Sequence, residues 1–280
     1  MAEITAALVS KLREMTNAGL MNCKQALVET QGNLDAAVDL LRKKGVATAA
    51  KKAMRDTKEG VIVQHILPGA RVGVLAEINC ETDFVAKNEG FRAFCDEVVR
   101  ALATNPETDV EALRVAQVAK TGENCKISRV QRIEVSGNGS VAAYIHTGGK
   151  VGVLVEVGAG QEATVAHDDF KQLVRDITLQ IAAANPTAVS RERLDPSIIE
   201  KEKEIAREQV KNKPPQAIQK IIEGKLEKYF QTVCLLDQGY VKQNSEITVR
   251  EHVQAIGKTL GDEISVRRFV RFQVGEAFPE

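Results

Sequence analysis

The spacing of apolar residues changes about sixty residues into the chain. In the first fifty residues they recur at the three- and four-residue intervals of a helix face, beginning with Ile4, Leu8, Val9 and Leu12. Turn-forming residues separate three such stretches, and Asn33 is placed to cap the third. Gly45 either ends this third helix or lies within it. The pattern predicts a small three-helix module at residues 1–56.

Beyond residue 57 the chain carries an internal repeat. The segment Arg-Val-Gly-Val-Leu-Ala-Glu at 71–77 returns 79 residues later as Lys-Val-Gly-Val-Leu-Val-Glu at 150–156. The segment at 122–129 corresponds to 261–268, which lies 139 residues later. The increase in offset indicates that about sixty residues are inserted within the second copy.

Each copy has the pattern strand, strand, helix, helix, strand. In the first copy these stretches fall at residues 61–67, 72–78, 91–103, 110–119 and 127–135. Pro68-Gly69 and Gly148-Gly149 are hairpin signals between paired strands. The pattern predicts an α+β fold with two antiparallel sheets, one at residues 57–137 and one at 138–280. Their outer faces can pair into one pseudo-symmetric core, although the sequence does not fix that geometry.

The insertion is helical throughout by its apolar spacing. Two amphipathic stretches are separated at 213–215, Lys-Pro-Pro, where proline cannot continue one helix but suits the start of the next. The pattern predicts an antiparallel helical hairpin at about residues 195–232. We expect its apolar stripes to pack on each other, and partner binding is the alternative.

Composition narrows the class of protein. The chain has 280 residues, of which 44% are hydrophobic, and its 38 Lys and Arg balance its 38 Asp and Glu. This balance and an aromatic content of 4% argue against nucleic-acid binding. The five cysteines include no C-x-x-C pair, which favours a reducing compartment over a disulfide framework or a zinc site. With no membrane span or signal peptide in the pattern, we expect a cytoplasmic protein.

One motif, at residues 77–87, carries the candidate chemistry. Asp83 and Phe84 stand side by side where a buried strand meets a helical pattern. Thr82 could simply cap the helix and Phe84 could belong to the core. The second copy, however, has Gly-Ala-Gly-Gln-Glu-Ala at 158–163 and thus lacks the pair. This asymmetry favours a role for Asp83 and Phe84 in contacting another molecule.

Two long segments resemble a known family. Residues 12–27 (LREMTNAGLMNCKQAL) and 77–87 (EINCETDFVAK) are similar to the two signatures of the elongation factor Ts family, in the same order and separation. Residues 32–41 also resemble the last helix of ubiquitin-associated (UBA) domains, so the first module is expected to be UBA-like. The resemblance covers nearly the whole chain, although some family members continue into a further helix where this chain ends at 277–280.

The resemblance implies a guanine nucleotide exchange factor. Family members bind the GDP form of elongation factor Tu and promote GDP release, so that this chain would be no enzyme and would need no cofactor or metal of its own. By the resemblance, the residues that reach the magnesium and phosphate end of the partner's site are Thr82, Asp83, Phe84 and Val85. Secondary partner contacts are implied for Arg13, Leu20, Met21 and His146.

The same residues also allow structural interpretations and other functions. Leu20 and Met21 could be core residues, Arg13 could be a solvated side chain, and His146 could be merely exposed. A UBA-type interaction adaptor outside translation would account for the first module but leave the repeated core without a role. A nucleophilic Cys80 would make the chain an enzyme, yet the neighbouring carboxylates Glu81 and Asp83 oppose thiolate formation.

Overall fold

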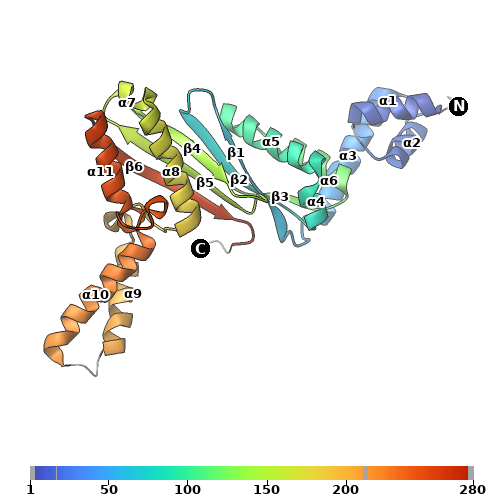
Figure 1. Ribbon diagram of the computed structural model, residues 1–280. Coiled ribbons are helices and arrows are strands. Elements are labelled where there is room, and N and C mark those ends of the chain that lie inside the picture. The colour runs from blue at the N-terminus through green and yellow to red at the C-terminus, as the bar shows by residue number, and fades with distance from the viewer. Residues whose placement is uncertain (1–3, 17, 211–213, 277–280) are drawn as a thin grey trace.

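The computed structural model describes residues 4–16, 18–210 and 214–276 and has an α+β fold (Figure 1). Three helices come first and pack around Leu12, Ala26 and Leu27: α1 (Ala6–Thr16), α2 (Leu20–Glu29) and α3 (Leu34–Lys52). The Asn33 side chain accepts a hydrogen bond from the Ala36 N–H at 3.0 Å, which caps α3 as predicted. The helix continues through Gly45. Asn17, Lys213 and the chain end at 277–280 lie outside the described residues.

The first antiparallel sheet has the order β1-β2-β3, with strands β1 (Glu59–Ile66), β2 (Val72–Cys80) and β3 (Cys125–Glu134). One face of this sheet packs against helix α5 (Glu89–Thr104), and helix α6 (Glu111–Thr121) joins the same core. Phe91 of α5 is fully buried there. Gly69 in the β1–β2 turn has a φ of +84°, a conformation that favours glycine, as the hairpin signal requires.

The second sheet has the order β4-β5-β6, with strands β4 (Gly139–Ile145), β5 (Val151–Ala159) and β6 (Ile264–Gln273). Its core is completed by helices α8 (Asp168–Ala184) and α11 (Val249–Leu260). Phe170 holds in α8 the place that Phe91 holds in α5, and it too is fully buried. Each sheet therefore has one face under helices, which is a common arrangement in an α+β fold.

The remaining face of each sheet lies against the other sheet. The contact is apolar and includes Ile62 and Leu75 from the first sheet and Val141 and Leu154 from the second. A Cβ added at Gly73 would lie 2.8 Å from Leu154 Cδ1, which is closer than real Cβ contacts allow. A side chain at this position would have to push the Leu154 methyl group aside, because the two sheets approach so closely.

Two arginines bind across this contact in a reciprocal way, each from an ion pair with a buried glutamate of its own sheet. The Arg129 guanidinium donates to the Glu77 carboxylate at 2.7 Å and to the Gln273 carbonyl of the other sheet at 2.9 Å. Arg268 donates likewise to Glu156 at 2.7 Å and to the Glu134 carbonyl at 2.9 Å. Each arginine thus satisfies a buried carboxylate of its own sheet and holds the neighbouring sheet in register.

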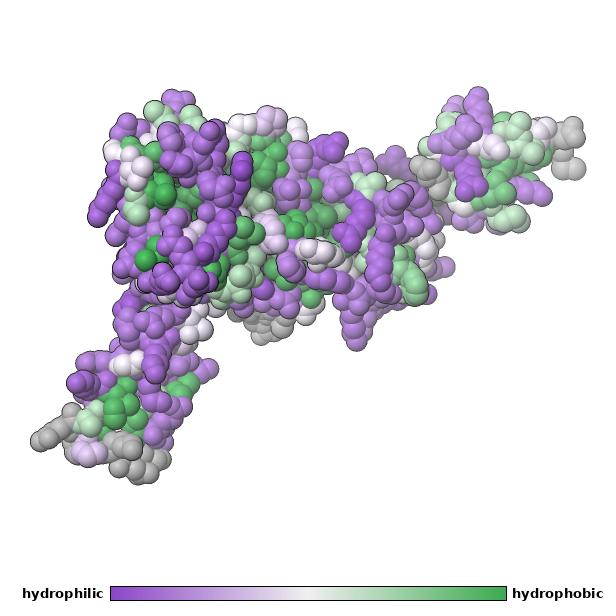
Figure 2. Space-filling model, viewed as in Figure 1, coloured by the Kyte–Doolittle hydropathy of each residue, from purple (hydrophilic) through white to green (hydrophobic). Residues whose placement is uncertain are grey.

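A helical arm projects from the second half, formed by α9 (Pro196–Val210) and α10 (Pro215–Val233) (Figure 1). Ala206 and Val210 of α9 pack against Ile222 of α10, so the two apolar stripes meet as predicted. On the face that Figure 2 shows, hydrophilic side chains cover much of the arm and apolar side chains are visible among them. Ala188 and Cys234 form a parallel β-bridge at its base.

The residues after β2 differ from the prediction. The sequence indicated a single helix beginning near Phe91, but the motif itself forms a separate one-turn helix, α4 (Asp83–Lys87). The Asn88 side chain then accepts hydrogen bonds from two backbone N–H groups and starts α5 at Glu89. A matching short helix, α7 (Glu162–Ala166), follows β5. Both helices have only five residues, which are too few to show a helical period in the sequence.

Candidate functional site

Helix α4 presents Phe84 to solvent. The Phe84 side chain is 81% exposed, although phenylalanine is usually buried. Its neighbours face inward, since Ala86 is buried and Val85 packs at the edge of the first core. The interpretation of Phe84 as a core residue is therefore wrong, and the ring is available to another molecule.

The start of α4 is held by a single carboxylate. Thr82 is the N-cap, and its Oγ1 accepts a hydrogen bond from the Val85 N–H at 3.3 Å. The Glu123 carboxylate accepts bonds from the N–H groups of Glu81 at 3.1 Å and Thr82 at 3.0 Å, and from Thr82 Oγ1 at 2.7 Å. Three bonds to one charged group fix the backbone that carries Phe84.

Asp83 carries a negative charge beside the exposed ring. Its carboxylate accepts a hydrogen bond from Lys87 Nζ at 2.7 Å, one turn along the helix. This bond, together with the lysine charge, lowers the pKa of the Asp83 carboxyl below its ordinary value. Asp83 is thus ionised at neutral pH.

The same corner is tied to the segment that follows α3. The Asn124 N–H donates to the Glu81 carboxylate at 2.6 Å, and the Asn124 side-chain amide donates to the Arg55 carbonyl at 2.9 Å. The three-helix module is therefore connected to the core close to the residues that support Phe84.

His146 lies in the turn between β4 and β5 and is exposed. Its Nδ1 is 3.1 Å from the Tyr144 hydroxyl, which orients the imidazole ring. A shallow apolar groove of about 380 Å³ lies beside it, lined by Val151, Leu179 and Lys242 among others. The turn therefore offers a histidine edge next to an apolar surface.

Arg13, Leu20 and Met21 lie on the three-helix module, away from α4. Leu20 is 49% and Met21 is 72% exposed, so the alternative that they are core residues is wrong. Arg13 is exposed at the end of α1. Apolar surface is visible on this module at the upper right of Figure 2. The structure does not bring these three residues together with Phe84.

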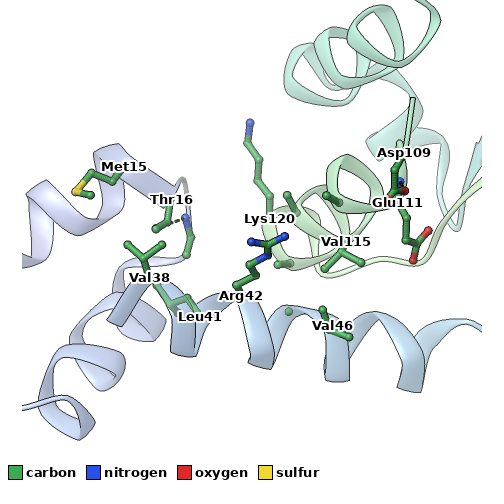
Figure 3. A pocket seen from close by; sticks show the side chains of 15 residues that line it. Met15, Thr16, Val38, Leu41, Arg42, Val46, Asp109, Glu111, Val115 and Lys120 are labelled. Carbon is green, nitrogen blue, oxygen red and sulfur yellow. Dashed lines mark hydrogen bonds between the residues drawn. The ribbon is translucent and has the colours of Figure 1, made fainter. Parts of the chain in front are cut away.

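A groove of about 400 Å³ separates the module from the core. Figure 3 shows Val38, Leu41 and Val46 of α3 on one side and Val115 of α6 on the other. Helices α3 and α6 approach each other at Gly45, where an added Cβ would lie 3.5 Å from Val115 Cγ1, in ordinary van der Waals contact. The two helices are therefore close at this place, although the contact does not require glycine.

Comparison with known proteins decides the family. The family model described as Elongation factor TS matches residues 81–276. Proteins named Elongation factor Ts from Nautilia profundicola and Symbiobacterium thermophilum are 44% and 45% identical to the chain. The first match covers 99% of this chain and 94% of the relative, and the second 99% and 93%. The one from Nitratidesulfovibrio vulgaris is 41% identical, with coverage of 98% and 96%.

The chain belongs to the elongation factor Ts family. This confirms the resemblance that the motifs at 12–27 and 77–87 indicated, and it places the protein among translation elongation factors. None of the helices within residues 4–16, 18–210 and 214–276 combines the length and apolar character that crossing a lipid bilayer requires.

For this elongation factor Ts family member, sequence reasoning missed the residues that support the motif. Lys87 carried a usable signal, since a lysine four residues after an aspartate on a helix pairs with it. Glu123 carried none, because it lies in a turn forty residues away from the backbone that it binds. Such contacts depend on how the strands bring distant segments together.

Cys80 does not suit a nucleophilic role. All five cysteines are buried and free, and burial, with smaller contributions from nearby groups, raises the pKa of the Cys80 thiol to about 12. We expect native protein treated with iodoacetamide at pH 8 to alkylate Cys80 at least about a hundredfold more slowly than protein unfolded in guanidinium. Peptide mass spectrometry measures both rates. Rapid labelling of Cys80 in native protein would contradict its burial and reopen the enzyme interpretation.

Proposed function

We propose that this protein is a guanine nucleotide exchange factor for elongation factor Tu, the GTPase partner that the family resemblance implies. It binds the GDP form of that protein and promotes GDP release during elongation in the cytoplasm, without a nucleotide, metal or nucleic acid of its own. The observation that carries the proposal is the Phe84 ring, 81% exposed on a one-turn helix that Glu123 holds in place.

The physical argument starts from the magnesium ion that neutralises the GDP phosphates in the partner. Disturbing its water and carboxylate ligands exposes the phosphates to uncompensated repulsion. When the Phe84 ring enters a pocket of the partner, burial of its apolar surface contributes about 1.5–3 kcal/mol of binding free energy. Asp83 brings a negative charge to the same place. Thr82 and Val85 set the position of both. Because binding free energies are coupled reciprocally, GDP weakens the complex as much as the complex weakens GDP.

The other implied contacts complete the proposal. Leu20 and Met21 would hold a helix of the GTPase domain together with Arg13, and His146 would contact a second domain of the partner. We further propose that the first module, residues 1–56, is UBA-like and that residues 57–137 and 138–280 arose by duplication. The matched positions of α4 and α7 and the reciprocal bonds of Arg129 and Arg268 between the sheets support that origin.

The direct test is stopped-flow release of fluorescent GDP from purified elongation factor Tu. We expect the release rate to rise with the concentration of this protein and to reach a plateau, because a complex forms before GDP leaves. An excess of GDP should compete with complex formation. A release rate that equals the intrinsic rate of the partner at every concentration would refute the proposed function.

A further inference from the structure

Arg92 connects α4 to the turn that carries His146. It is the fourth residue of α5 and is half-buried. Its Nε–H donates to the Ala86 carbonyl at 2.8 Å, in the last turn of α4, where carbonyls lack helical partners. Its Nη2 donates to the Gly148 carbonyl in the β4–β5 turn at 3.4 Å. One guanidinium therefore spans two segments that are about sixty residues apart.

The β4–β5 turn is itself firmly attached at this place. The Ile62 N–H of β1 donates to the Gly149 carbonyl at 2.7 Å, and Lys150 pairs with Glu59. A Cβ at Gly149, whose φ is +74°, would lie 2.9 Å from Arg92 Nη1. The backbone passes so close to the guanidinium that a side chain there would displace it. Arg92 thus links α4 to a fixed point.

The second half of the molecule has the same architecture without such a link. Lys171 is the fourth residue of α8, as Arg92 is of α5, but it pairs with Asp168 of its own helix at 3.1 Å. A groove of about 930 Å³ lies between α7 and the β1–β2 turn, lined by Lys171, Val165 and Gly69 among others. The fold therefore does not require the link that Arg92 makes.

We propose that Arg92 is a positioning residue that makes α4 and the His146 turn one rigid contact surface. The inference rests on the exchange function proposed above. Phe84 lies two residues before Ala86, and His146 lies two residues before Gly148. Arg92 therefore binds a backbone carbonyl close to each of these two proposed partner-contact residues. If α4 were free to move relative to the core, insertion of Phe84 into the partner would displace α4 and leave the partner's phosphate-binding elements in place. A held α4 transfers the displacement to the partner.

The test compares Arg92→Ala and Arg92→Lys with Lys171→Ala, the matched control at the corresponding place in α8. Stopped-flow GDP release gives the maximal rate and the half-saturating concentration, and thermal unfolding gives the Tm. We expect Arg92→Ala to lower the maximal rate about tenfold with a smaller change in the half-saturating concentration. The maximal rate of Arg92→Lys should lie between those of Arg92→Ala and the wild type, because a lysine ammonium can reach one of the two carbonyls more readily than both. Lys171→Ala should match the wild type.

A second measurement needs no partner. Hydrogen exchange at the Ala86 and Asn88 amides, which close α4 through the Thr82 and Val85 carbonyls, should speed up in Arg92→Ala and stay unchanged in Lys171→Ala. Unchanged exchange there would overturn the inference. The inference would also be overturned if Phe84→Ala slowed release while Arg92→Ala kept the wild-type maximal rate, whether or not its half-saturating concentration rose. Failure of the wild-type protein to stimulate release would instead refute the proposed function, and the exchange of the α4 amides would still decide whether Arg92 holds α4.

Discussion

Replacing Phe84 with alanine is expected to slow the stimulated release of GDP from elongation factor Tu by about tenfold to a hundredfold. The ring is 81% exposed in the free protein, so its removal leaves no cavity in the core. The apolar free energy of the ring is gained only when it enters the partner, and alanine cannot supply it. Thermal unfolding should give a Tm close to that of the wild type.

The control for this variant is Ile198→Ala. Ile198 is an apolar residue on the projecting arm with 41% exposure, so its truncation removes exposed apolar area of another region. It should leave the release rate unchanged. Wild-type release rates in Phe84→Ala would show that the ring does not act on the partner, and a large fall in Tm would show that the ring supports the fold of the free protein.

Replacing Arg129 with methionine is expected to destabilise the protein by about 3–5 kcal/mol. The Glu77 carboxylate is only 3% exposed, and Arg129 neutralises it at 2.7 Å. Methionine fills much of the volume but leaves a buried charge without its partner. The same change removes the bond to the Gln273 carbonyl and the stacking of the guanidinium over the Phe272 ring at 4.3 Å. Urea unfolding followed by circular dichroism measures the loss.

Lys126→Met is the matched control, because Lys126 is an exposed residue of the same strand. It should change the free energy of unfolding by less than about 0.5 kcal/mol. The double variant Glu77→Leu with Arg129→Met should recover part of the loss, since it buries no lone charge. Equal stabilities for Arg129→Met and Lys126→Met would mean that neither the Glu77 pair nor the Gln273 bond of Arg129 contributes to stability.

Much of the fold could be predicted because the apolar spacing is strong where elements are long. The hairpin signals at Gly69 and Gly148 occur where tight turns require glycine, and the apolar stripes of the arm match its packing. The one-turn helices α4 and α7 escaped prediction, because five residues are too few to show a helical period. The reciprocal bonds of Arg129 and Arg268 also escaped, since they depend on how two sheets face each other.

The candidate site was predictable in its residue types but not in its support. Asp83 and Phe84 were singled out because the second copy lacks them, and Phe84 is exposed as that argument requires. That Leu20 and Met21 are exposed could not be decided from spacing, because either face of a short helix can carry apolar residues. Glu123 and Arg92 bind backbone N–H and carbonyl groups of other segments, and residues of any type carry such groups. Only their placement in space marks them.

The arm leaves the core and returns to it at neighbouring places, because Ala188 before the arm and Cys234 after it are bridged. A segment whose two ends already touch can be shortened, extended or exchanged beyond its base without changing any distance in the rest of the molecule, since the entropy of a loop varies only slowly with its length. A reporter peptide or an affinity tag can therefore be grafted at the end of the arm away from the Ala188–Cys234 bridge.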